Sequence, residues 1–205
     1  MNRLKTAAAA LGIGAVIVAG ASACSSNTME AQPSTAATVV GSATDIAFAQ
    51  AMIPHHQQAV EMADMALDPK ADASPAVKRY AEEIKQAQGP EIDQMTTWLQ
   101  SWGAPTAMPG ASGDMHGMDH SGHDMGGMTM SGMMTPEDMQ TLSTLSGQPF
   151  DTMWLEMMIA HHEGAIQMAE QVKSETSDPE VEQLANDIIT AQEAEIEQMR
   201  KTLDA

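Results

Sequence analysis

The chain of 205 residues is acidic, with a formal net charge of −19, and its aromatic residues amount to only 3%. Such a charge argues against a nucleic-acid-binding protein, because the phosphates would be repelled. The one cysteine excludes an intramolecular disulfide, so packing or a bound metal must stabilise the fold. The length suffices for one domain with a sizeable core.

The N-terminus predicts an exported protein. Arg3 and Lys5 precede an apolar run over residues 7–20, and small residues then lead to Cys24. This is the pattern of a secretory signal peptide, and it is too short to be preferred as a membrane-spanning helix. Cys24 stands where a lipoprotein carries its acylated cysteine. We therefore predict an extracytoplasmic protein, either anchored to the outer face of a bacterial cell membrane through lipid on Cys24 or secreted.

Two copies of one module follow the N-terminal region. Residues 51–63 align with 157–169 at an offset of 106, and residues 87–95 align with 191–199 at an offset of 104. An internal repeat of this kind constrains the predicted architecture more strongly than any single predicted helix or strand does. The predicted segments are a signal peptide at 1–23, a lipidated N-terminus and flexible linker at 24–43, a first helical hairpin at 44–104, a Met/His-rich flexible loop at 105–136, and a short helix with a second helical hairpin at 137–205.

Each copy predicts a pair of amphipathic helices. In the first helix of each copy, apolar residues and histidines recur every three or four positions, as on the buried face of a bundle helix. The second helix begins at a cap residue followed by proline, Ser74-Pro75 in one copy and Asp178-Pro179 in the other. Prolines fall inside these helices only in the first copy, which predicts a less regular first half. The pattern predicts an all-α four-helix bundle of two repeated hairpins with a long crossover, and no β-sheet.

Polar side chains interrupt the apolar stripes of all four helices at matching positions. Burying them is costly unless they bond to one another or to a ligand. One interpretation is a metal site in which imidazoles and soft thioethers are the ligands. The other is a polar core network, in which His–Glu hydrogen bonds fix the register and methionines fill gaps. The candidate ligands on the helices are His55, His56, Met52, Met62, Glu91, Met95, His161, His162, Met158, Met168, Glu195 and Met199.

The segment between the copies is a second candidate site. Residues 108–139 hold nine methionines and three histidines among glycines and short polar residues, so we expect no packed element there. Thioethers suit Cu(I), whereas imidazoles also take Cu(II) and zinc. Copper, and Cu(I) in particular, is the predicted metal, and zinc, which prefers His, Asp and Cys, is the rival. The candidate ligands here are Met115, His116, Met118, His120, His123, Met125, Met128 and Met130.

The repeated motifs at 52–63 and 87–95 resemble those of the bacterial domain of unknown function 305 family, and the resemblance runs from about Thr44 to the C-terminus. It implies a ferritin-like four-helix bundle that is exported and, in some members, linked to copper handling and resistance. The crossover resembles segments of exported copper-resistance proteins. By position, the His-His motif of the family falls on His55, His56, His161 and His162, and its Gln-x-x-Glu-x-x-x-Met pattern falls on Gln88, Glu91, Met95, Gln192, Glu195 and Met199.

Three functions compete on these observations. The first is a non-catalytic protein that buffers, sequesters or relays copper outside the membrane for copper tolerance, with a copper-handling protein as a partner. The second is a di-metal oxidase, but such a site needs Glu-x-x-His motifs that are absent at the expected places. The third is a helical bundle that docks a membrane partner and has no metal role. We favour the first hypothesis and expect no enzymatic activity.

Overall fold

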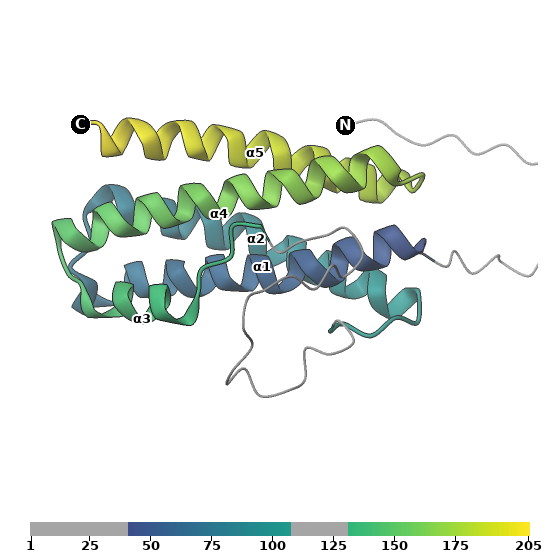
Figure 1. Ribbon diagram of the computed structural model, residues 1–205, viewed down its shortest axis with the longest axis horizontal. Coiled ribbons are helices and arrows are strands. Elements are labelled where there is room, and N and C mark those ends of the chain that lie inside the picture. The colour runs from purple at the N-terminus through teal and green to yellow at the C-terminus, as the bar shows by residue number, and fades with distance from the viewer. Residues whose placement is uncertain (1–40, 108–130) are drawn as a thin grey trace, which may run out of the picture. The chain divides into compact units, whose positions relative to one another are not determined.

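The computed structural model describes residues 41–107 and 131–205, and this part of the chain is entirely helical apart from its connections. Four long helices form two hairpins, as Figure 1 shows. The predicted all-α bundle of two hairpins is therefore confirmed for the described residues, while most of the predicted crossover lies outside them. The elements are α1 (Ala43–Leu67), the 3₁₀ turn η1 (Pro69–Ala71), α2 (Pro75–Ser101), α3 (Pro136–Thr144), α4 (Gln148–Glu175) and α5 (Pro179–Leu203).

The helices pack as two antiparallel hairpins joined along one helix pair. The most extensive contacts are those of α1 with α2 and of α4 with α5. Contact between α1 and α4 joins the two hairpins, α2 and α5 touch less, and α3 lies against α4. The first helices of the two copies, which carry the His-His motifs, are therefore neighbours at the centre of the bundle.

The helix starts follow from local sequence. Ser42 begins α1 with a capping box, in which its hydroxyl accepts from the Asp45 N–H and the Asp45 carboxylate accepts from the Ser42 N–H. Ser74 and Asp178 cap α2 and α5, each with proline at the first helical position, as the sequence predicts. Each cap satisfies backbone N–H groups that the helix itself leaves without partners.

The prolines of the first copy do not break their helices. Helix α1 continues past Pro54 and α2 continues past Pro90. A proline inside a helix removes one ladder hydrogen bond. The buried neighbours Ile53 and His55 keep α1 packed at that point, so tertiary contacts outweigh the local preference.

Two apolar clusters occupy the two ends of the bundle, and the polar stripe residues lie between them. Along α1, the residues before His55 belong to one cluster and the residues after His56 belong to the other. Along α4 the order reverses, because the helices run antiparallel. The first apolar cluster, at the η1 end, takes its residues from 59–73, 77–84, 139–142, 150–158 and 196–199, and the second takes them from 48–53, 95–99, 165–172 and 181–188.

The polar residues thus form a layer across the middle of the bundle, to which each long helix contributes two side chains. We refer to them as the polar layer. Its members are His55, His56, Gln88, Glu91, His161, His162, Gln192 and Glu195. Within the described ranges, no helix combines the length and the apolar character that crossing a bilayer requires.

Trp154 tests the packing between the hairpins. Its side chain is fully buried, and its indole N–H donates to the Met62 carbonyl at 2.8 Å. We expect Trp154→Ala to lower the free energy of unfolding by about 3–5 kcal/mol, because it leaves a large cavity and removes the indole hydrogen bond to Met62. Urea denaturation measures the change. Trp102→Ala, which truncates a partly exposed indole, is the matched control, and equal losses in the two variants would contradict this account.

Candidate metal centre

The polar layer is buried at its centre and partly exposed at its edges. The four histidines are at most 1% exposed, and Gln88 and Gln192 are 2% and 3% exposed. The side chains of Glu91 and Glu195 are 18% and 20% exposed. The structure therefore brings together the eight polar residues that the sequence singles out, with imidazoles inside and carboxylates toward solvent.

His55 and His161 stack at the centre of the layer. Their ring centroids lie 3.7 Å apart, and the ring planes are tilted by 40°. Because the rings are in van der Waals contact, no ion fits between their faces. An ion bound by both imidazoles would have to lie at the ring edges, where the nitrogens are.

Each hairpin adds one histidine–carboxylate pair. His56 Nε2 lies 2.7 Å from Glu91 Oε2, and His162 Nε2 lies 2.7 Å from Glu195 Oε2. The two pairs occupy equivalent positions in the two copies. The predicted His–Glu hydrogen bonds are therefore present, and each joins the first helix of a hairpin to its second.

Many polar atoms of this layer have no hydrogen-bond partner in the protein. A buried polar atom without a partner costs on the order of 1–3 kcal/mol, so native proteins hold few of them. Here they gather in one layer, which is what a ligand-binding centre requires. They are His55 Nδ1, His56 Nδ1, His161 Nδ1 and Nε2, His162 Nδ1, Gln88 Oε1 and Nε2, and Gln192 Oε1.

Burial keeps the central imidazoles neutral. It lowers the pKa of His55 from 6.5 to about 3, and the nearby His56 contributes to the lowering. Burial also lowers the pKa of His161 well below its ordinary value, with His55 as the second cause. A neutral imidazole is the form that binds a metal, because a protonated ring has no free lone pair.

Buried methionines lie above and below the polar layer. Met52 and Met158 precede the central histidines His55 and His161 by three residues, so each shares a helix face with its histidine. Soft thioethers and neutral imidazoles are thus available from α1 and α4 together. The buried candidates are Met52, Met62, Met95, Met158, Met168 and Met199, none more than 2% exposed.

Residues 131–134, at the end of the crossover that leads into α3, are also part of the site, and the sequence analysis did not predict this. The Ser131 carbonyl lies 3.0 Å from His55 Nε2. Gln58 holds the same segment by two hydrogen bonds to the main chain of Met134, and Gly164 allows close approach to Ser131. The repeat contained a signal for this contact, because the aligned positions Gln58 and Gly164 differ while the residues around them are similar in the two copies.

Other predicted ligands lie outside the described residues. This holds for the candidates between Met115 and Met130, and the predicted lipidation site Cys24 also lies outside the described residues. Among the residues that the structure does describe, no three His, Cys, Asp or Glu side chains converge as a metal site would require. A site within the bundle would therefore need methionine, or the Gln amides, beside its histidines.

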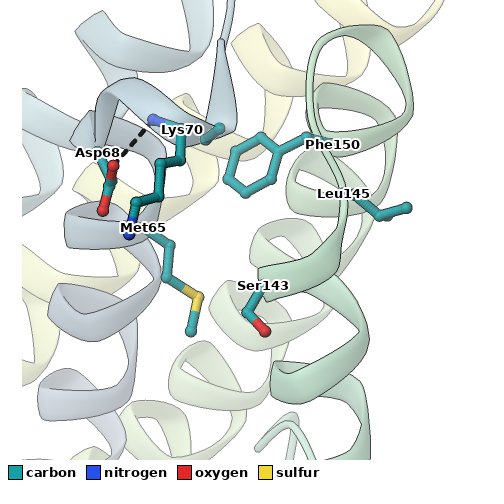
Figure 2. A pocket seen from close by; sticks show the side chains of 7 residues that line it. Met65, Asp68, Lys70, Ser143, Leu145 and Phe150 are labelled. Atoms are coloured by element: carbon teal, nitrogen blue, oxygen red, sulfur yellow. Dashed lines mark hydrogen bonds between the residues drawn. The ribbon is translucent and has the colours of Figure 1, made fainter.

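A separate pocket of about 250 Å³ lies at the η1 end of the bundle. Figure 2 shows that Asp68 there accepts from the Lys70 main-chain N–H, a hydrogen bond of 2.8 Å. Met65 supplies the one thioether and no histidine lines the pocket, so it has little to offer a metal. Its lining residues are Met65, Asp68, Lys70, Ala71, Ser143, Leu145 and Phe150.

Comparison with solved structures finds the same fold in several proteins. A DUF305 protein from Streptomyces coelicolor is 31% identical, with a TM-score of 0.67 over 78% of this chain and 91% of that one. CopM in a Cu(II)-bound form is 37% identical, with a TM-score of 0.61 over 78% of this chain and 95% of CopM. A DUF305 fragment from Deinococcus radiodurans is 29% identical, with a TM-score of 0.66 over 80% and 97%.

Comparison of sequences finds one further relative and a matching family. The uncharacterized protein L153 of Acanthamoeba polyphaga mimivirus is 44% identical over 54 residues, which are 26% of this chain and 36% of that protein. The match thus spans about a third of the length of that relative. The model of the family described as domain of unknown function (DUF305) matches residues 45–203, which contain both hairpins and the whole polar layer. The chain belongs to the DUF305 family.

Proposed function

We propose that this protein is a non-catalytic copper-binding lipoprotein that buffers, sequesters or relays copper outside the cytoplasm and so contributes to copper tolerance. The observation that carries the proposal is the polar layer, where neutral imidazoles with unpartnered nitrogens lie between buried methionines. Buried nitrogens without a partner in the protein cost free energy in an apolar bundle, and a bound metal would offset that cost.

The relatives support copper as the metal. CopM is known in Cu(II)-bound, Cu(I)-bound and silver-bound forms, and its Cu(I)-bound and co-crystallised silver-bound forms are 34% and 32% identical to this chain. Silver and Cu(I) are soft ions that favour thioether and imidazole ligands. The six buried methionines of the bundle offer that chemistry.

The donor set argues against zinc and against a di-metal oxidase. Zinc sites take three or four ligands from Cys, His, Asp and Glu, and carboxylate-bridged sites need several carboxylates. No three such side chains converge among the described residues. The two carboxylates of the polar layer, Glu91 and Glu195, are each hydrogen-bonded to a histidine.

The remaining parts of the proposal rest on the sequence. The crossover thioethers and imidazoles from Met115 to Met130 form a second copper-binding region, and lipid on Cys24 anchors the protein to the outer face of the membrane. The relative from Streptomyces coelicolor, a predicted secreted protein, supports export. A copper-handling protein partner would deliver or receive the metal.

A competition titration with Cu(I) under anaerobic, reducing conditions tests the role of the bundle. We expect the double variant Met52→Leu, Met158→Leu to lose at least tenfold in affinity, because leucine keeps the volume but removes the sulfur. The matched control is Met65→Leu, Met153→Leu, which changes two partly buried methionines outside the polar layer. Equal affinities of the wild type and both variants would rule out thioether ligation at these positions, and no binding at all by the wild type would overturn the copper proposal.

A second titration tests the crossover. Its variant replaces each methionine by leucine and each histidine by glutamine, and it keeps residues 131–134, which contact the bundle. We expect the number of Cu(I) ions bound per chain to fall while the bundle site keeps its affinity. An unchanged stoichiometry would contradict a role of this segment in binding. The substituted residues are Met115, His116, Met118, His120, His123, Met125, Met128 and Met130.

The metal-free protein should lose stability on acidification because of its buried histidines. The folded-state pKa of His55 is about 3, below its ordinary value of 6.5, and that of His161 is lowered too. Their contribution to the free energy of unfolding is therefore complete above pH 6.5 and is lost progressively as the pH falls below that value, toward about 3 for His55. Urea denaturation from pH 7 to pH 4 measures it. The variant His55→Gln, His161→Gln should show a shallower slope, and equal slopes would refute the expectation.

A further inference from the structure

The two copies of the repeat differ at the position that contacts residues 131–134, the end of the crossover that leads into α3. Gln58 and Gly164 occupy equivalent positions on α1 and α4. The Gln58 amide donates to the Met134 carbonyl at 2.9 Å and accepts from the Met134 N–H at 2.7 Å. A Cβ atom on Gly164 would lie 1.9 Å from the Ser131 carbonyl oxygen, so only glycine permits the contact. Both differences therefore serve to fix residues 131–134 against the bundle.

This fixation sets the position of one proton on His55. The Ser131 carbonyl lies 3.0 Å from His55 Nε2 and has no hydrogen to donate, so Nε2 must carry the proton. In a neutral imidazole the other nitrogen, Nδ1, then holds the lone pair. His55 Nδ1 is buried and has no partner in the protein.

The histidine–carboxylate pairs have the same arrangement. His56 and His162 each place Nε2 at 2.7 Å from a glutamate oxygen, and each has an unpartnered, buried Nδ1. A carboxylate that accepts the Nε2 proton fixes the tautomer and strengthens the opposite nitrogen as a ligand. Three of the four imidazoles thus have an oxygen acceptor on Nε2, and His161 has none on either nitrogen.

We propose that Ser131, Glu91 and Glu195 are positioning residues that hold His55, His56 and His162 in the Nε2–H tautomer, so that Nδ1 is the nitrogen of each ring left free to bind a metal. The proposal rests on the proposed copper function and adds to it the ligating atom of each ring. It also assigns Glu91 and Glu195 to orienting the ligands instead of binding the ion themselves. His161 remains able to bind through either nitrogen.

Two-dimensional ¹H–¹⁵N NMR of the imidazoles in the whole, metal-free protein at neutral pH tests the tautomers directly. We expect His55, His56 and His162 each to carry the proton on Nε2. In Gly164→Ala, the added methyl displaces Ser131, and the His55 signals should shift toward a mixture of tautomers. Gly89→Ala is the matched control, because a Cβ at this helical glycine meets nothing within 4 Å. A wild-type His55 protonated on Nδ1, or a spectrum unchanged in Gly164→Ala, would overturn the proposal.

Copper titration of the same variants provides the second readout. We expect Gly164→Ala to lower the affinity for Cu(I) by about 10- to 100-fold, the range for loss of a group that orients a metal ligand. Gly89→Ala should keep the wild-type affinity. Should Gly164→Ala fail to fold, Gln58→Leu removes the hydrogen bonds to Met134 without added bulk and carries the same expectation. A copper affinity equal to that of the wild type in a folded variant with a shifted tautomer would refute the positioning role.

The glutamates are tested by removing and then restoring an acceptor. Glu91→Ala and Glu195→Ala remove it, and the paired histidine should become a mixture of tautomers. Glu91→Gln and Glu195→Gln keep an amide oxygen that accepts, so the Nε2–H tautomer should persist. Alanine variants with the wild-type tautomer would contradict the proposal. Absence of copper binding by the wild type would refute the proposed function alone, since the tautomers are read without metal.

Discussion

The structure depends on one constraint: four buried imidazoles, of which the central two are kept neutral, must be accommodated inside an otherwise apolar bundle. Burial lowers the pKa of His55 and His161 and so disfavours their charged form, and several nitrogens of the four rings have no acceptor in the protein. The bundle meets this constraint by confining the polar groups to a single layer, with complete apolar packing on both sides. The two apolar clusters supply the stability of the bundle, so the side chains of the layer between them need not be chosen for apolar packing. The partly exposed glutamates at the edges of the layer complete it by accepting from the outer histidines.

Duplication explains both the regularity and the asymmetry of this layer. Each copy supplies two histidines, one glutamine and one glutamate at equivalent positions, which gives matching histidine–carboxylate pairs. A chain with two hairpins has only one crossover, however, and Ser131 near its end accepts a hydrogen bond from the ring of His55, whereas the ring of the equivalent His161 has no such partner. The exchange of Gln58 for Gly164 follows from this, because one copy binds the crossover by hydrogen bonds and the other makes room for it. The two halves of the site are therefore chemically different despite their common sequence.

The bundle could be predicted from the sequence because its determinants are periodic or local. The apolar stripes, the Ser74-Pro75 and Asp178-Pro179 caps and the repeat all lie within single helices or their direct alignment. The eight polar residues were found for the same reason, since each interrupts a stripe. The Ser131 contact could not be found, because a backbone carbonyl has no distinctive residue type and its partner His55 lies 76 residues away. Nor does helical spacing distinguish a glutamate that binds an ion from one that, like Glu91, faces a histidine at the edge.

Under the proposed function, the neutral donors at the centre of the polar layer would favour a monovalent ion. Its central candidate ligands, imidazole and thioether, are neutral, so a bound ion keeps its full charge in a medium of low polarity. The free energy of transferring an ion from water into a low-dielectric interior rises with the square of its charge, so burial there would disfavour a divalent ion more than Cu(I). The compensating charges available are the carboxylates of Glu91 and Glu195, each one imidazole ring away from an unpartnered Nδ1. A divalent ion would therefore draw on these two carboxylates for its stability, whereas Cu(I) would depend mainly on the neutral donors at the centre. On this argument, losing the glutamate charge should weaken Cu(II) more than Cu(I), even where glutamine preserves the tautomer of the histidine.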